Sequence, residues 1–155
     1  MLIERLLVIG LSFLVTACAT SMNEEPATPN SLEREQHRVL TEEFVQQAAL
    51  GNVPELVASM ARITLKANDR AALEGYLRDQ IAPFFHGYSR LRWEGQYLTV
   101  KDDLGNTGVQ YYEFVEISNG DARPFVITLF PEDGRHRVTN IVVGECFRGY
   151  HLTCP

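Results

Sequence analysis

Lysine is scarce in this chain of 155 residues, which contains only Lys66 and Lys101 and has a formal net charge of −6. A basic patch that could neutralise phosphates is missing, so we do not expect nucleic-acid binding. The chain also lacks a phosphate-binding glycine loop, a zinc-protease helix, a nucleophile elbow and a paired-cysteine redox motif. We therefore expect no cofactor, no metal centre and no assigned catalytic residue.

Long apolar runs are missing too, since none reaches the roughly 20 residues of a membrane-spanning helix. The run at residues 6–17 follows the basic Arg5 and closes on small residues before Cys18, which predicts a signal peptide over residues 1–17. Residues 14–18, Leu-Val-Thr-Ala-Cys, resemble a bacterial lipobox. The resemblance implies that Cys18 becomes the lipid-modified, palmitate-bearing first residue of the mature protein. The alternative is an ordinary signal peptide with an incidental cysteine.

The residues after Cys18 predict a tether. Residues 19–30 are small, polar and interrupted by proline, so they bury too little to fold. By resemblance to sorted lipoproteins, Ala19 implies the outer membrane, with the protein facing the periplasm and contacting the membrane through its lipid. Residues 31–155 then remain for a single domain, because they suffice for one core and not for two.

Cysteine is limited to three residues. With Cys18 reserved for lipid, Cys146 and Cys154 form an even pair in an oxidising compartment, and we expect a disulfide between them. So short a loop adds about 2 kcal/mol to the free energy of unfolding. The alternative is a metal site made by both cysteines and His151, which lacks the fourth ligand of a structural zinc site.

The first half of the domain predicts helices. Asn30 and Glu33 form a capping box at the start of a helix that should end at Gly51. A second helix follows with Pro54 in its first turn, and a third should begin at Asn68. The apolar positions expected to face the core recur at helical spacing: Leu40, Phe44, Ala48, Leu56, Val57, Met60, Leu73, Tyr76, Leu77, Ile81 and Phe84.

The second half predicts strands separated by turn sequences. The expected strands are 91–100, 109–117, 124–130 and 137–147. The hairpin connections between the last three are short, so these strands should run antiparallel. Helices followed by a meander of strands predict an α+β fold, in which the helices pack on one face of a curved antiparallel sheet of about four strands.

This order of elements resembles the NTF2-like, cystatin-related cone fold over about 120 residues. The likeness is carried by residues 44–56, where a helix, Gly51-Asn52 and a second short helix look like the opening of that family. Asn52 departs from the family's pattern, which commonly has aspartate after the glycine. The resemblance implies a cone that either encloses a small ligand or is filled by side chains, and it implies catalysis in some members.

The candidate pocket residues are His86, Tyr111 and Glu113. Glu113 shares one strand face with Tyr111, and its pKa should be raised if that face lines the cone. The interpretation that we prefer is that this face points away from the helices or that Glu113 reaches water. His86 should pair with a helix-end carbonyl near the mouth of the cone, His37 should lie on the flank of the first helix, and His136 should be solvated.

Two classes of function compete. A protein-binding module held at the membrane is a third. The preferred function is a non-catalytic, membrane-tethered envelope lipoprotein whose domain binds a small apolar ligand or a protein partner. The alternative is an NTF2-like isomerase, cyclase or dehydratase that transfers protons with Glu113 and His86. Apolar residues on the outer sheet face, including Tyr112 and Phe114, also predict a homodimer, unless the tail after Cys146 covers them.

Overall fold

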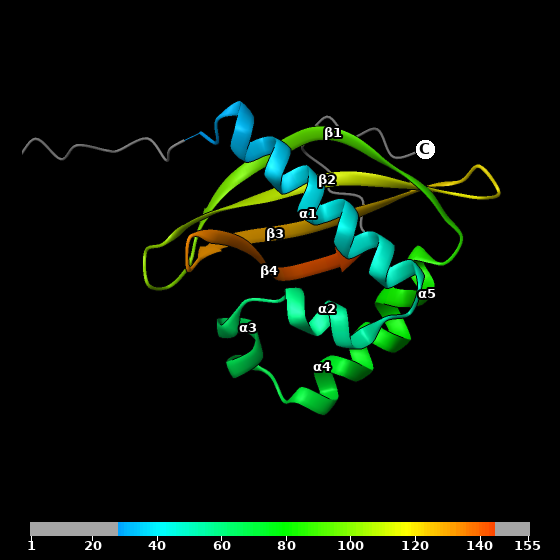
Figure 1. Cartoon of the computed structure of the whole chain (residues 1–155), viewed down its shortest axis with the longest axis horizontal. Helices are drawn as coiled ribbons and strands as arrows, with labels where there is room; N and C mark the ends of the chain where they lie inside the picture. The colour runs from blue at the N-terminus through cyan, green and yellow to red at the C-terminus, as the bar shows by residue number, and fades with distance from the viewer. Residues whose placement is uncertain (1–27, 145–155) are drawn as a thin grey trace, which may run out of the picture.

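The chain places its helices before its strands, and the helices pack on one face of a curved antiparallel sheet (Figure 1). The α+β fold predicted from the sequence is therefore confirmed. The computed structural model describes residues 28–144. Cys18, the signal and tether residues up to 27, and both Cys146 and Cys154 lie outside the described residues, so lipidation and the disulfide stay predictions.

The first helix, α1 (Ser31–Ala49), begins and ends where the sequence predicts. In the capping box, Asn30 Oδ1 accepts from the Glu33 N–H at 3.0 Å and Glu33 Oε2 accepts from the Asn30 N–H at 2.9 Å. Gly51 follows the helix with a φ of 69°, which glycine adopts at little cost. Both ends of α1 are thus fixed, and its buried residues keep a defined position over the sheet.

Short helical segments connect α1 to the sheet. The helix α2 (Val53–Ser59) has proline in its first turn as predicted, whereas α3 (Arg62–Ala67) is not anticipated by the sequence pattern. The next helix starts later than predicted, because the side chain of Asp69, not that of Asn68, caps α4 (Arg70–Tyr76).

The chain continues from α4 through a π-helical segment, η1 (Leu77–Ile81), into α5 (Ala82–Phe85). The wider π-helical turn shifts the inward positions to a four-residue spacing. These positions are Leu73, Leu77, Ile81 and Phe85, all buried. The prediction that Tyr76 faces the core is wrong, since Tyr76 is 41% exposed, whereas Phe84 is partly buried and packs against the core as predicted.

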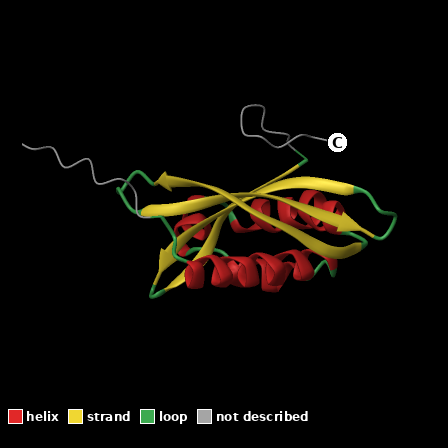
Figure 2. Cartoon of the chain, turned by 90° about the horizontal axis from the view of Figure 1, so that it is seen from above, coloured by secondary structure: helices red, strands yellow, loops and turns green. Residues whose placement is uncertain are grey.

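The sheet is a four-stranded meander with the order β1-β2-β3-β4, every neighbouring pair being antiparallel. Its strands are β1 (Tyr88–Lys101), β2 (Thr107–Ile117), β3 (Ala122–Glu132) and β4 (Arg135–Val143). The predicted turn before β4 forms at Asp133 and Gly134, which have φ angles of 51° and 76°. A view from above shows the sheet twisting across the helices (Figure 2).

The core lies between the helices and the inner sheet face. Alternate residues of β2 and β3 meet across the strands there, as in the pairs Val109–Leu129 and Tyr111–Ile127. Phe44 of α1 packs in the same cluster. Within the described residues, no helix is long and apolar enough to cross a membrane.

The outer sheet face is also apolar at its centre. Tyr112, Phe114 and Val126 alternate with the inner residues, so they point away from the core cluster. Their side chains are nevertheless 5%, 5% and 2% exposed. The expected open apolar patch is therefore not seen at these three residues, and the homodimer through this face stays a prediction.

Candidate functional site

Glu113 lies on the inner face of β2. Its neighbours on that face, Tyr111 and Val115, belong to the core, and residues two apart on a strand share a face. Glu113 itself is 1% exposed. The preferred interpretation from the sequence, in which this face points away from the helices or reaches water, is therefore wrong.

A bulge in β1 explains how the core accommodates this carboxyl group. Residues 93–95 of β1 lie opposite the single residue Glu113, which leaves backbone donors of β1 without strand partners. The N–H groups of Glu94 and Gly95 donate instead to the Glu113 carboxyl oxygens, at 2.6 and 2.9 Å. Gly95 has a φ of 68°, which suits glycine. The carboxyl group of Glu113 thus supplies the hydrogen-bond acceptors that backbone carbonyl groups supply in regular strand pairing.

The surroundings of Glu113 act on its pKa in opposite directions. Burial disfavours the charged carboxylate and raises the pKa of Glu113 to about 8, while the two backbone N–H groups oppose part of this change. Both oxygens are occupied by the bulge, and Glu113 does not line the cleft described below. The geometry therefore assigns Glu113 a structural role.

Tyr111 joins β2 to α1 through a buried hydrogen bond. Its Oη lies 2.9 Å from Nδ1 of His37, and the rings of Trp93 and Tyr97 pack against it with centroids 4.6 and 5.7 Å away. Burial raises the pKa of Tyr111, so its phenol keeps its proton. Burial, together with the nearby His136, lowers the pKa of His37 to about 4, so this imidazole is neutral at pH 7.

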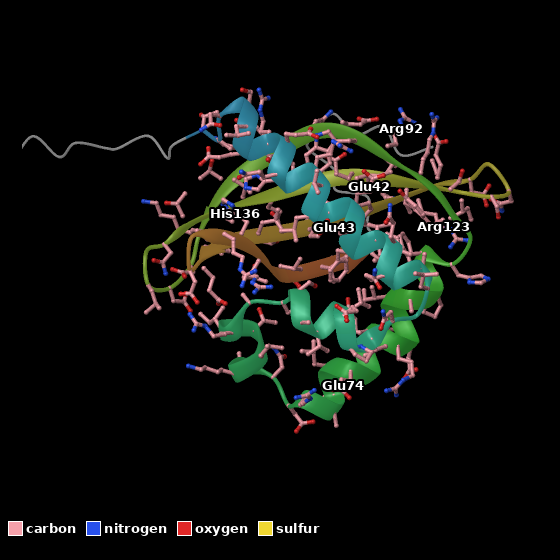
Figure 3. The ribbon with its side chains drawn as sticks, in the orientation of Figure 1. Glu42, Glu43, Glu74, Arg92, Arg123 and His136 are labelled. Atoms are coloured by element: carbon pink, nitrogen blue, oxygen red, sulfur yellow. The ribbon has the colours of Figure 1, made fainter. Side chains whose placement is uncertain are left out.

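His136 lies at the start of β4 (Figure 3). Its ring packs against that of His37. The ring centroids are 4.1 Å apart, and the rings are nearly perpendicular at 82°. His136 is half-buried, and burial lowers its pKa while the Glu33 carboxylate opposes this. The prediction of a flank position for His37 and a solvated His136 is wrong, because the buried face of α1 includes His37 and the start of β4 turns His136 toward it.

Two buried polar atoms of α1 have no hydrogen-bond partner within the described residues. They are Nε2 of His37 and Oγ1 of Thr41. These two residues are 1% and 0% exposed. Leaving such an atom unpaired costs about 1–3 kcal/mol. The two lie one helical turn apart on the same face of α1. This part of the core is therefore short of at least one hydrogen-bonding group.

A cleft of about 1110 Å³ opens between α1, α2 and the start of β4, and neither His37 nor Thr41 lines it. Its apolar lining includes Val39 and Leu40, while Phe44 and Leu56, which also line it, are only 2% and 0% exposed. His136 also lines it, so the imidazole that covers His37 faces the cleft on its other side. A small molecule in the cleft would contact His136 directly.

Charged side chains surround this cleft at its exposed margin. Glu43 of α1, Glu55 of α2 and Arg135 of β4 all line it and are exposed. None of the three makes a hydrogen bond or ion pair within the described residues. The margin of the cleft therefore carries charges of both signs.

His86 lies apart from the other two candidate pocket residues. It ends α5, where its backbone N–H donates to the Pro83 carbonyl at 3.3 Å, and it is exposed. Two residues later, Tyr88 pairs with Ile117, which is four residues from Glu113 and thus roughly 13 Å away along the strand. The structure brings Tyr111 and Glu113 onto one face and does not add His86 to them.

Neither a metal centre nor a known family accounts for this site. Within residues 28–144, no three His, Cys, Asp or Glu side chains are grouped so that they could hold a metal ion. No family model matches the chain, and neither a curated protein nor a solved structure shows significant similarity to it. The function must therefore be inferred from the site itself.

A helical-spacing signal could have identified His37 and Thr41. The buried residues of α1 are His37, Thr41, Phe44, Val45 and Ala48, which recur every three or four positions. The predicted core stripe includes Leu40 and omits both polar residues. Extending the stripe backwards from Ala48 gives Thr41 and His37, whereas His136 has no comparable local signal.

Proposed function

We propose that the protein is a membrane-tethered lipoprotein of the bacterial envelope whose NTF2-like domain binds a small, mainly apolar ligand without transforming it. The observation that supports binding is the cleft of about 1110 Å³, since sites for small molecules need roughly 300 Å³ or more. The lipobox-like residues around Cys18 support the tether and an outer-membrane, periplasm-facing location.

The positions of the acid–base candidates favour binding over catalysis. A proton-transfer enzyme needs its acid and base within reach of one substrate. Glu113 is held by the β1 bulge and His86 is exposed at the end of α5, so the two do not face a common cavity. The enzyme alternative therefore lacks the arrangement on which it was based.

Ligand binding is tested by blocking the cleft. Ala58 lines the cleft and is exposed, so Ala58→Trp should obstruct part of the cleft without disturbing the core. A library of small amphiphiles is screened by NMR on protein labelled at Val, Leu and His side chains. Binders should shift Val39 and His136 in the natural protein and lose at least tenfold in affinity in Ala58→Trp.

The matched control is Ala71→Trp, which adds the same side chain at an exposed position of α4 outside the cleft. It should bind like the natural protein. If no compound shifts Val39 or His136, or if binding survives Ala58→Trp unchanged, the proposed binding site is rejected.

The tether is tested separately in cells. Cys18→Ser should move the protein from the membrane fraction to the soluble fraction, because it removes the atom that would carry the lipid. Mass spectrometry of the natural protein should show a lipid-modified N-terminal cysteine. An intact, unmodified Met1 terminus would reject the lipoprotein assignment and leave the binding proposal in place.

A further inference from the structure

The outer face of the sheet is buried although it is not part of the core. Its central residues Tyr112, Phe114 and Val126 are 5%, 5% and 2% exposed, and none of them belongs to the core cluster. The helices pack on the opposite face (Figure 1). An antiparallel sheet that is covered on one side only exposes the side chains of its other side to water. A second cover is therefore required over this face.

The described side chains account for only part of this cover. The guanidinium of Arg92, on β1, lies 5.5 Å from the centre of the Phe114 ring. Val126 is the least exposed of the three, yet it lies on β3, one strand farther from Arg92 than Phe114 does. Its partners in register, Tyr112 and Val142, stand beside it on the same face. Neighbours within one layer shield the flanks of a side chain and leave its tip open, so Val126 needs a group above it.

The described part of the chain ends at the border of this patch. The Gly144 N–H donates to the Pro124 carbonyl at 3.0 Å, and Pro124 lies opposite Phe114. Phe114 in turn lies opposite Arg92, so these four residues form one row across the sheet. With strands about 4.8 Å apart, Phe114 lies roughly 10 Å from Gly144, and Arg92 lies roughly 15 Å from it. Whatever follows Gly144 therefore starts beside the outer face.

Residues 145–155, which follow Gly144, have the length and composition to supply the cover. An extended chain of this length reaches up to about 36 Å, more than twice the distance to Arg92. The segment contains one acid and one arginine, and its large apolar side chains are Phe147, Tyr150 and Leu152. Because it is attached next to the patch, its effective local concentration is on the order of millimolar, whereas a second copy must associate from solution. The attached segment is thus favoured over a second copy.

We infer that residues 145–155 fold back over the outer face of the sheet and pack on Tyr112, Phe114 and Val126. The surface predicted to bind a second copy is then occupied by a segment of the same chain, and a protein partner of this face must displace that segment. The inference does not depend on ligand binding in the cleft, which lies among the helices and the start of β4.

Photo-cross-linking tests where the segment lies. The photoreactive residue p-benzoylphenylalanine replaces Arg92, which is exposed at the far end of the row. The purified protein is irradiated, reduced and digested with trypsin, and the linked peptides are identified by mass spectrometry. We expect position 92 to link to residues 149–155, the peptide that trypsin releases after Arg148. An equal mixture of unlabelled and isotope-labelled protein distinguishes a link within one chain from a link between copies.

The matched control places the same photoreactive residue at the position of His86. His86 is exposed two residues after Phe84, whose ring lies 3.8 Å from the position that a Cβ of Gly144 would take. A segment that moves freely would reach His86 at least as easily as Arg92, while a segment packed on the outer face should not. We expect the yield of the link to be at least about fivefold higher from position 92.

A second measurement removes the apolar contacts and keeps the segment. Phe147→Ser combined with Leu152→Ser should expose the outer face and raise the fluorescence of an apolar dye such as ANS by about twofold or more. Thr153→Ser is the control, because it keeps a hydroxyl at its position, and it should bind the dye like the natural protein. Melting curves establish that the variants are folded, and if the double variant does not fold, cross-linking alone decides.

Three kinds of outcome would overturn the inference. A link between labelled and unlabelled chains would show that a second copy covers the face. Equal yields from positions 92 and 86, or no link from position 92 to residues 149–155, would show that the segment is not held there. Unchanged dye fluorescence in the folded double variant would show that its apolar side chains do not cover the face. None of these outcomes bears on ligand binding in the cleft.

Discussion

Glu113 and His37 are buried to the same degree in one core, yet their side-chain polar atoms differ in hydrogen bonding. Each residue is 1% exposed. Both oxygens of Glu113 accept backbone N–H groups of the β1 bulge, whereas Nε2 of His37 has no partner within the described residues. Glu113 lies away from the cleft, and His37 is separated from it by one ring.

The difference distinguishes a structural polar group from a candidate functional one. A buried group with all its hydrogen bonds made stabilises the conformation around it, and its removal leaves the partners unpaired. A buried group with a free atom next to a cleft lowers stability and gains energy when a ligand supplies the missing bond. The raised pKa of Glu113 therefore reports burial, and Nε2 of His37, which has no partner among residues 28–144, is the better guide to function.

The largest expected effect comes from removing the satisfied group. Glu113→Ala leaves the N–H groups of Glu94 and Gly95 unpaired and opens a cavity, so it should lower the free energy of unfolding by about 3–5 kcal/mol, measured by urea denaturation at pH 7. Glu116→Ala is the control on the same strand. It removes an ion pair with the exposed Arg90, which solvent screens, and should cost far less than Glu113→Ala.

A loss from Glu113→Ala no larger than that of the control would show that the bulge does not depend on Glu113. The structural assignment would then be wrong, and the carboxyl would again be open to a role in chemistry.

The fold was largely predictable because its signals are local. The capping box at Asn30, the stop at Gly51 and the turn at Asp133-Gly134 each involve residues close in sequence, and all form as expected. The prediction failed where the chain departs from regular α-helical spacing. The π-helical segment at Leu77–Ile81 changed the spacing of the inward residues, and the apolar pattern of the sequence did not predict this turn.

The candidate site was less predictable because its contacts are remote in sequence. His37 meets Tyr111, 74 positions away, and the ring of His136 comes from the opposite end of the domain. The strand pattern did place Glu113 beside Tyr111 on one face. It could not show which face was buried or that a bulge in β1 would take up the carboxyl, since strand alternation is the same in either case.

The second effect is a pH dependence that differs between the two groups. Glu113 has a pKa of about 8 in the folded protein against 4.5 when free, so its contribution to stability is complete below pH 4.5 and is lost as the pH rises through 8. His37, with a folded pKa of about 4 against 6.5, contributes above pH 6.5 and loses that contribution as the pH falls through 4.

The two contributions oppose each other between pH 4.5 and 6.5 and separate above it. From pH 6.5 to 8 the protein should lose about 2 kcal/mol of unfolding free energy through Glu113. Urea denaturation across this range should show the loss in the natural protein and not in Glu113→Gln. A flat profile in the natural protein would mean that the N–H groups of the bulge outweigh burial and keep Glu113 ionised.

A smaller effect is expected from the backbone of the bulge. Gly95 has a φ of 68°, and an added Cβ would lie 3.3 Å from Nε1 of Trp93, so Gly95→Ala should cost about 1–2 kcal/mol. Gly75→Ala is the control, because it lies in α4 with open space around it and should be neutral or slightly stabilising. Equal melting temperatures for both variants would show that the bulge tolerates other conformations.

The smallest change tests the unsatisfied side of the comparison, and it has the opposite sign. Thr41→Val removes a buried hydroxyl that has no partner within the described residues and keeps the shape of the side chain. It should therefore raise the free energy of unfolding, by up to about 1 kcal/mol, in urea denaturation without ligand. Thr128→Val removes a bonded hydroxyl and should lower it by a similar amount. If Thr41→Val is instead destabilising by more than about 1 kcal/mol, the hydroxyl already has a partner such as a buried water, and His37 and Thr41 would belong with Glu113 among the groups that hold the fold.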